Sequence, residues 1–140
     1  MTIAVGDTLP DVTLIKPTAD GPEKVQSSDF FAGRKVALFS VPGAFTPTCS
    51  AKHLPGFVEK AAELKARGVD EIACTAVNDP FVMGAWGARD GSSDVTMLAD
   101  GNGEFAKALG LTMDGSGFGL GLRGSRWSMV VNDGKVEQLN

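Results

Sequence analysis

The sequence predicts a single α/β domain, residues 1–140, with a central mixed β-sheet flanked by helices. Three observations lead to this fold class. Strand-length apolar clusters recur along the chain, helical periodicity separates the first three, and an Asp-Gly turn follows the last. A chain of 140 residues, 43% of them hydrophobic, can bury one substantial core. The clusters lie at residues 36–39, 72–77, 95–98 and 127–131.

The N-terminal part of the chain is expected to form short extended pieces joined by turns. Pro10, Pro17, Gly21 and Pro22 punctuate it. After the last cluster, Asp133-Gly134 suits a two-residue turn with positive φ, which would return residues 135–139 as an antiparallel strand. The sheet is therefore predicted to be mixed.

Three helices are predicted, each from different signals. The longest spans residues 54–64, has apolar residues at spacings of three and four, and stops at Gly68. Another begins with Asp79 as its N-cap and Pro80 at its first position, although Gly84 and Gly87 weaken its continuation.

The third helix covers residues 104–109 and ends at Gly110. Residues 114–126 hold five glycines, so apolar period assigns no backbone structure there.

Composition excludes several classes of protein. The net charge of −4, without a local Lys/Arg cluster, argues against binding nucleic acid or an anionic membrane. Residues 1–7 carry no basic segment leading into an apolar stretch, and no hydrophobic run reaches membrane-spanning length, so we expect a cytoplasmic protein. Two cysteines are too few for a disulfide scaffold. Their chemistry is therefore of more interest than cross-linking.

Cys49 lies between the strand predicted at 36–40 and the helix predicted at 54–64. The first turn of that helix should direct unbonded N–H groups and its positive dipole end toward the sulfur. A thiol with an ordinary pKa of ~8.5 is only about 3% ionised at pH 7, whereas helix N-termini lower that pKa to roughly 3.5–7.5. The position therefore favours a reactive thiolate.

The segment before Cys49 adds polar and rigid groups. Thr46 and Thr48 carry hydroxyls able to donate to a thiolate or a peroxide oxygen, and Pro42 and Pro47 stiffen the loop. By position alone, Cys49 could equally be a buried small hydrophobe, with the threonines serving as helix caps.

A resemblance to a known family favours the reactive thiolate. Residues 42–57, Pro-Gly-Ala-Phe-Thr-Pro-Thr-Cys followed by Ser-Ala-Lys-His-Leu-Pro-Gly-Phe, resemble the active-site segment of type-5 peroxiredoxins, close to plant type-II and bacterial glutaredoxin-dependent members. Residues 77–82, 86–87, 98–100 and 126–131 match as well, so the resemblance covers nearly the whole chain. It implies a thioredoxin-like fold.

The resemblance also assigns roles in hydroperoxide reduction. It implies that Cys49 attacks the peroxide and becomes sulfenic acid, that Thr46 hydrogen-bonds peroxide and sulfur, and that Pro42 shields the pocket. Arg126, which precedes an aromatic-Ser-Met strand, matches the family's arginine, while Arg123 is its rival for that role. A fixed cation would stabilise charge that moves from sulfur to the departing oxygen.

The route by which the sulfenic acid is resolved is less defined. Cys74 shares a strand face with apolar neighbours, which is typical of an unreactive core thiol, yet some relatives use a cysteine 25 positions after the peroxidatic one as resolving thiol. A C-terminal resolving cysteine is absent, so the resemblance favours glutathione with glutaredoxin, or thioredoxin, as reductant. No cofactor and no metal are needed. Because the family usually continues into a final helix, we expect a C-terminal truncation after Asn140.

Three aromatic side chains are candidates for the substrate pocket. Matching positions to Phe45, Phe81 and Phe118 line the pocket mouth and a homodimer interface in relatives. For Phe81 and Phe118, the sequence by itself favours a place in the core over a ligand role.

Other functions have weaker support in the sequence. Residues 119–124 match the G-x-G-x-x-G spacing of a dinucleotide-binding loop. They lead into a strand and not into a helix, so we do not interpret them as such a loop. His53, the only histidine, has no supporting protease or zinc motif. No Cys-x-x-Cys pair supports a general thiol-disulfide oxidoreductase. A redox sensor oxidised at Cys49 without turnover remains the main alternative to a peroxidase.

Overall fold

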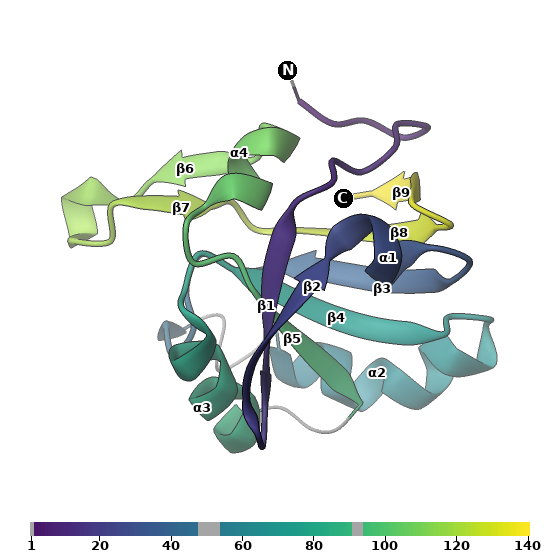
Figure 1. Cartoon of the computed structure of the whole chain (residues 1–140), viewed down its shortest axis with the longest axis horizontal. Helices are drawn as coiled ribbons and strands as arrows, with labels where there is room; N and C mark the ends of the chain where they lie inside the picture. Colours follow the sequence, from purple (N-terminus) through teal and green to yellow (C-terminus); the bar gives the residue numbers. More distant parts are fainter. Residues whose placement is uncertain (1, 48–53, 91–93) are drawn as a thin grey trace.

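The computed structural model describes residues 2–47, 54–90 and 94–140. Within these ranges, seven strands form one mixed sheet in the order β2-β1-β5-β4-β3-β8-β9 (Figure 1). The strands are β1 Thr13–Thr18, β2 Gly21–Gln26, β3 Lys35–Ser40, β4 Glu71–Ala76, β5 Val95–Ala99, β8 Trp127–Asn132 and β9 Lys135–Leu139.

The centre of the sheet is parallel and its flanks are antiparallel. Strands β3, β4 and β5 run parallel, whereas β8 pairs antiparallel with β3, and β1 with β5. The four apolar clusters all form strands, as the sequence predicts, and these four strands lie next to one another in the sheet. The hairpin to β9 is also confirmed, with Asp133 at φ 49° and Gly134 at φ 80°.

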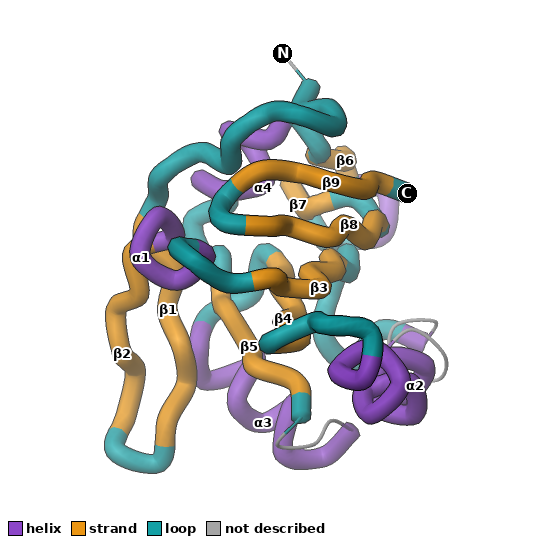
Figure 2. The backbone as a smooth tube through the Cα atoms, turned by 90° about the vertical axis from the view of Figure 1, so that its right-hand side faces the viewer, coloured by secondary structure: helices purple, strands orange, loops and turns teal. Residues whose placement is uncertain are grey.

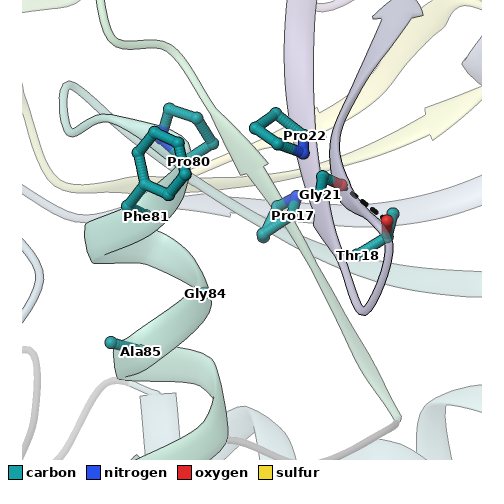
Figure 3. Close-up of a pocket in the computed structure, with 8 residues that line it drawn as sticks. All are labelled: Pro17, Thr18, Gly21, Pro22, Pro80, Phe81, Gly84 and Ala85. Atoms are coloured by element: carbon teal, nitrogen blue, oxygen red, sulfur yellow. Dashed lines mark hydrogen bonds between the residues drawn. The ribbon is translucent and has the colours of Figure 1, made fainter.

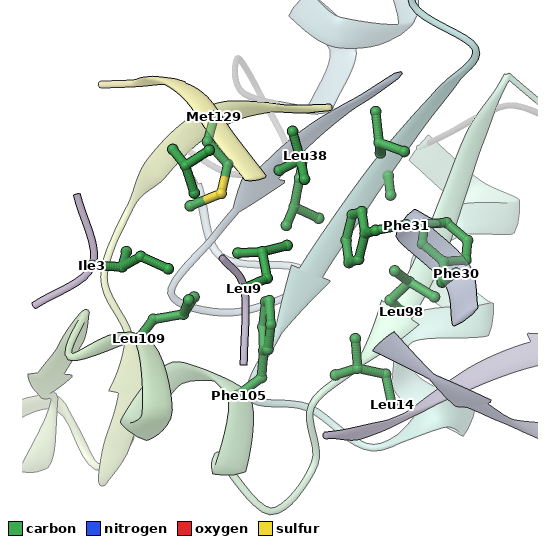
Figure 4. Packing of buried hydrophobic residues seen from close by; sticks show 14 of the residues in the cluster. Ile3, Leu9, Leu14, Phe30, Phe31, Leu38, Leu98, Phe105, Leu109 and Met129 are labelled. Atoms are coloured by element: carbon green, nitrogen blue, oxygen red, sulfur yellow. The ribbon is translucent and has the colours of Figure 1, made fainter. Parts of the chain in front are cut away.

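Helices cover both faces of the sheet (Figure 2). On one face, α2 (Leu54–Ala66) and α3 (Pro80–Asp90) bury Leu54, Ala61, Met83 and Trp86 against the central strands. On the other face, α1 (Ser27–Phe31) and α4 (Glu104–Leu109) pack with N-terminal residues in a second cluster (Figure 4). This arrangement is the predicted thioredoxin-like fold.

Helix α3 corrects one sequence-based expectation. It begins as predicted, with Val82 N–H donating to Asp79 Oδ1 at 2.8 Å, but it runs through both glycines to Asp90. A Cβ at Gly84 would lie 3.1 Å from Pro17 Cβ, and one at Gly87 would lie 3.0 Å from Met97 Cγ. The glycines therefore allow α3 to pack closely against β1 and β5.

The glycine-rich stretch after α4 has a defined structure. Strands β6 (Thr112–Asp114) and β7 (Leu122–Gly124) form a separate antiparallel pair, joined through the short 3-10 helix η2 (Ser116–Phe118). This hairpin projects from one side of the molecule (Figure 1). Turn geometry with positive φ at Gly119 and Gly121 explains why apolar period could not assign it.

Candidate active site

The segment from Val41 to Pro47 follows β3 directly. The loop after β4, beginning at Val77, leaves the same edge of the sheet because the two strands are parallel. Ligands of open α/β sheets bind at this carboxyl edge. Cys49, the predicted nucleophile, and His53 fall within residues 48–53 and lie outside the described residues. The Val41–Pro47 segment leads to them in sequence and is described up to Pro47.

The loop that precedes Cys49 is a tight turn around Gly43. Its carbonyl accepts the Thr46 hydroxyl at 2.6 Å and the Thr46 N–H at 3.3 Å. Phe45 has φ 64°, the left-handed region that costs energy for a bulky side chain. Because the single hydroxyl proton of Thr46 is directed at Gly43, the oxygen presents acceptor lone pairs to a ligand, whereas the sequence suggested a donor.

Two neighbouring segments anchor this turn. Ala44 N–H donates to Asn78 Oδ1 at 2.9 Å, which joins the turn to the loop after β4. Arg123 of β7 donates through Nη1 to the carbonyls of Val77 and Pro42, at 3.2 and 3.5 Å. Sequence reasoning missed Asn78, although it lies in one of the segments that matched the family.

The two candidate arginines have different surroundings. Arg123 is half-buried and its Nε also donates to the Leu120 carbonyl at 2.9 Å, so its guanidinium is engaged by backbone oxygens. Arg126 is exposed and directly precedes β8, where Trp127 pairs with Ser40. That register places Arg126 level with the chain as it leaves β3 for the candidate loop.

The three predicted pocket aromatics are solvent-exposed, and this rules out the core alternative for Phe81 and Phe118. Their exposed fractions are 41% for Phe45, 74% for Phe81 and 88% for Phe118. Phe45 carries the Arg89 guanidinium over its ring at 4.6 Å. Phe81 also lines an apolar hollow at the start of α3.

An apolar hollow of about 180 Å³ lies between the start of α3 and the β1–β2 hairpin (Figure 3). Phe81 and Pro80 form one wall, and Pro17 and Pro22 face them from the hairpin. The hollow presents apolar surface to the solvent beside a highly exposed phenylalanine.

Asp100 lies buried at the same sheet edge, directly after β5. Its two carboxylate oxygens accept the N–H groups of Phe105 and Ala106, at 3.0 and 2.9 Å, and so cap helix α4. Burial raises the pKa of Asp100, and these two hydrogen bonds oppose the shift. Asp100 is thus a structural group that holds α4 near the site.

Cys74 lies in the middle of β4, beside Phe39 and Met97, and its exposed fraction is 0%. It shares a face with Ile72 and Ala76 in the cluster beneath α2 and α3, as the sequence predicts. Any reaction of this thiol with a sulfenic acid would require the strand to open.

Two further features of the described residues bear on function. They contain no group of three or more His, Cys, Asp or Glu side chains arranged to hold a metal ion. They also contain no helix with the length and apolar character to cross a membrane. The G-x-G-x-x-G run leads through β7 into β8 and not into a helix, as expected.

Comparisons with known proteins show which family the chain belongs to. Residues 4–140 match the Redoxin family. The chain is 57% identical over 145 residues to Peroxiredoxin-2E-2, chloroplastic, of Oryza sativa subsp. japonica, covering 99% of this chain and 64% of that protein. It is 51% identical over 142 residues to Peroxiredoxin-2B of Arabidopsis thaliana, covering 99% of this chain and 86% of the relative. The chain thus spans less than two thirds of the rice protein's length.

A solved structure shows the same likeness in three dimensions. The crystal structure of reduced Prx3 in complex with H2O2 from Vibrio vulnificus superposes with a TM-score of 0.96 at 52% identity. The match covers 99% of this chain and 87% of that one. By family match, sequence identity and fold together, the chain belongs to the peroxiredoxins of the redoxin family.

Proposed function

We propose that this chain is a thiol-dependent peroxidase that reduces hydrogen peroxide and alkyl hydroperoxides through Cys49. The Cys49 thiolate attacks the terminal peroxide oxygen, so that an S–O bond forms and the O–O bond breaks. The departing oxygen takes the electron pair and a proton and leaves as water or alcohol, while the sulfur becomes sulfenic acid. The observation that carries this proposal is the anchored Pro42–Thr46 turn immediately before Cys49, in a chain that belongs to the peroxiredoxins.

The groups around Cys49 suggest a division of labour. Thr46 Oγ1 accepts the O–H of the bound peroxide, since its own proton is directed at Gly43. Pro42 shields the sulfur, and Arg126 stabilises negative charge as it moves to the departing oxygen. The register of β8 against β3 supports Arg126 for this role.

An external thiol is proposed to recycle the sulfenic acid. Full burial of Cys74 in a central strand supports this route over an internal disulfide. A thiol of glutathione or thioredoxin would condense with the sulfenic acid to a mixed disulfide and release water. A second thiol, from glutaredoxin or from the same thioredoxin, would then attack this disulfide and release Cys49 as thiolate. The proposed reaction uses no metal or organic cofactor.

Stopped-flow kinetics test the first chemical step. We expect wild type and Cys74→Ala to consume hydrogen peroxide far faster than Cys49→Ser, which should react no faster than buffer. The Cys74 variant is the matched control, because it removes the other thiol and leaves the candidate loop intact. Equal rates for wild type and Cys49→Ser would contradict the proposal.

Turnover separates this proposal from a redox sensor. Steady peroxide removal with glutathione plus glutaredoxin, or with thioredoxin and its reductase, supports a peroxidase. One stoichiometric burst that neither reductant renews would instead favour a sensor oxidised at Cys49.

The apolar hollow and Phe81 support two further parts of the proposal. An exposed phenylalanine beside a proline-lined hollow is the kind of surface that a second copy of the chain would bury in a homodimer. Phe45 and Phe118 are proposed to contribute apolar surface near the pocket mouth, which would suit alkyl hydroperoxides.

A cytoplasmic location stays a prediction. Peroxiredoxin-2E-2 of rice is named chloroplastic, whereas the name of Arabidopsis Peroxiredoxin-2B gives no compartment. Fractionation of the source cells, with detection by an antibody against this chain, would locate the protein.

A further inference from the structure

Arg123 joins three segments that are distant in sequence. Its Nε donates to the Leu120 carbonyl at 2.9 Å within the β6–β7 hairpin. Its Nη1 reaches the carbonyl of Val77 in the loop after β4, at 3.2 Å, and that of Pro42 in the loop after β3, at 3.5 Å. A single half-buried guanidinium therefore connects the hairpin to both loops at the carboxyl edge of the sheet.

The chemistry of these contacts requires an arginine. A guanidinium holds its N–H donors in a rigid planar fork, so one side chain can address carbonyls that face it from several directions. A lysine ammonium is a compact point charge on a flexible stem and cannot reproduce that arrangement. Gly43 makes room for the guanidinium, because a Cβ there would lie only 3.2 Å from Arg123 Nη1.

The contacts of Arg123 lead directly to Thr46. Pro42, held by Arg123, precedes Gly43, and Ala44, held by Asn78 Oδ1 at 2.9 Å, follows it. The Gly43 carbonyl in turn accepts a hydrogen bond from the Thr46 hydroxyl at 2.6 Å. The position of the Thr46 oxygen thus depends on a turn that is fixed on one side by Arg123 and on the other by Asn78.

We propose that Arg123 is a positioning residue that fixes the Pro42–Thr46 turn through backbone carbonyls, while Arg126 supplies the charge that acts on the peroxide. This inference rests on the proposed peroxidase function and deepens it. Through Nε and Nη1, Arg123 holds the carbonyls of Leu120, Val77 and Pro42, and its effect on the reaction passes through the Pro42–Thr46 turn. Loss of this contact would displace Thr46 without removing any group that touches the substrate.

The test compares Arg123→Lys and Arg123→Gln with the matched control Arg34→Lys. Arg34 is also half-buried and also donates through Nε to a backbone carbonyl, that of Phe30 at 3.0 Å, but it precedes the opposite end of β3. Two measurements are made on each folded variant: kcat/KM for hydrogen peroxide, and hydrogen exchange of the Ala44 and Thr46 amides by NMR. Circular dichroism verifies that each variant is folded.

For both Arg123 variants, we expect kcat/KM to fall about 10- to 100-fold, the scale of a small misplacement of a reacting group. Exchange of the Ala44 and Thr46 amides should accelerate up to about tenfold, as when one hydrogen bond is lost. Arg34→Lys should stay within about twofold of wild type in both measurements. Lysine should rescue neither property relative to glutamine.

Two outcomes would overturn the inference. Unchanged amide exchange in both Arg123 variants would show that the residue does not hold the turn. Restored activity in Arg123→Lys, but not in Arg123→Gln, would show that its charge acts directly. A wild-type protein without peroxidase activity would defeat the proposed function alone, because amide exchange would still decide whether Arg123 holds the turn.

Discussion

At the scale of single residues, Asp100 shows how a buried carboxylate serves the framework of the site. The side chain is 4% exposed, and both oxygens accept backbone N–H groups at the start of α4. Burial disfavours its charged form and raises its pKa, while the two hydrogen bonds favour the charge. The stability that Asp100 contributes should therefore depend on pH.

We predict that Asp100→Asn lowers the free energy of unfolding at neutral pH by about 1 kcal/mol, the usual worth of a helix cap. The asparagine amide group would direct N–H donors at one of the two backbone donors that Asp100 now binds. Urea unfolding, followed by circular dichroism, measures the difference.

The free energies of unfolding of wild type and Asp100→Asn should differ most at low pH. A raised pKa means that the folded chain holds this proton more tightly than the unfolded chain does. The resulting stability is present below about pH 4, where an ordinary Asp titrates, and declines as the pH rises through the folded pKa. The gap between wild type and Asp100→Asn should therefore narrow from acidic to neutral pH. A gap that widens with pH would contradict the assigned direction of the shift.

Some candidate site residues could be predicted from the sequence more easily than others. Cys49, Thr46, Pro42 and Arg126 stand in local motifs, so the family resemblance could point to them directly. The contacts of Arg123 with Pro42 and Val77 cross 81 and 46 residues of chain. Such a contact depends on how strands and hairpins assemble, and no local pattern of residue types encodes it.

At the scale of elements, α3 shows that tertiary packing can override the low helix propensity of glycine. Glycine disfavours a helix interior, so Gly84 and Gly87 suggested a weak continuation, yet the helix is intact to Asp90. In contrast, strands β3, β4, β5 and β8 were predictable to within a residue or two at each end because each contains a strand-length apolar cluster, whereas β1 and β2 were expected only as short extended pieces. The β6–β7 hairpin was not, because its turns are set by glycine conformations and not by apolar period.

We predict that Gly84→Ala destabilises the protein even though alanine is the better helix former. By helix propensity alone, alanine would raise the free energy of unfolding by as much as about 1 kcal/mol. Its Cβ, however, would lie 3.1 Å from Pro17 Cβ, on a rigid ring fixed in the β1–β2 hairpin, and such overpacking costs about 1–3 kcal/mol. Chemical denaturation gives the net change.

Ala88→Gly is the control for helix propensity, because Ala88 is an exposed residue of the same helix. This variant should have a free energy of unfolding about 1 kcal/mol lower than that of wild type. If Gly84→Ala instead gained a similar amount, α3 would have room to move away from β1, and the close-packing explanation would fail.

At the scale of the whole molecule, the surface beside α3 predicts an assembly. The hollow lined by Pro17, Pro22, Pro80 and Phe81 lies on the outside of the fold, and Phe81 exposes 74% of its surface. The two core clusters lie on the faces of the sheet and are covered by helices, so this apolar surface serves no core. A second copy of the chain is the partner that we propose for it.

We predict that Phe81→Asp converts a dimer into a monomer without unfolding the chain. A carboxylate in an apolar interface would lose its hydration without gaining a partner, which strongly disfavours association. Size-exclusion chromatography with light scattering, over a range of concentrations, should give two chain masses for wild type and one for the variant. Val5→Asp is the matched control, since it places the same charge at another exposed apolar position, 61% exposed, and should remain dimeric. A wild-type mass of one chain at every concentration would refute the dimer, and a dimeric Phe81→Asp would move the interface to another surface.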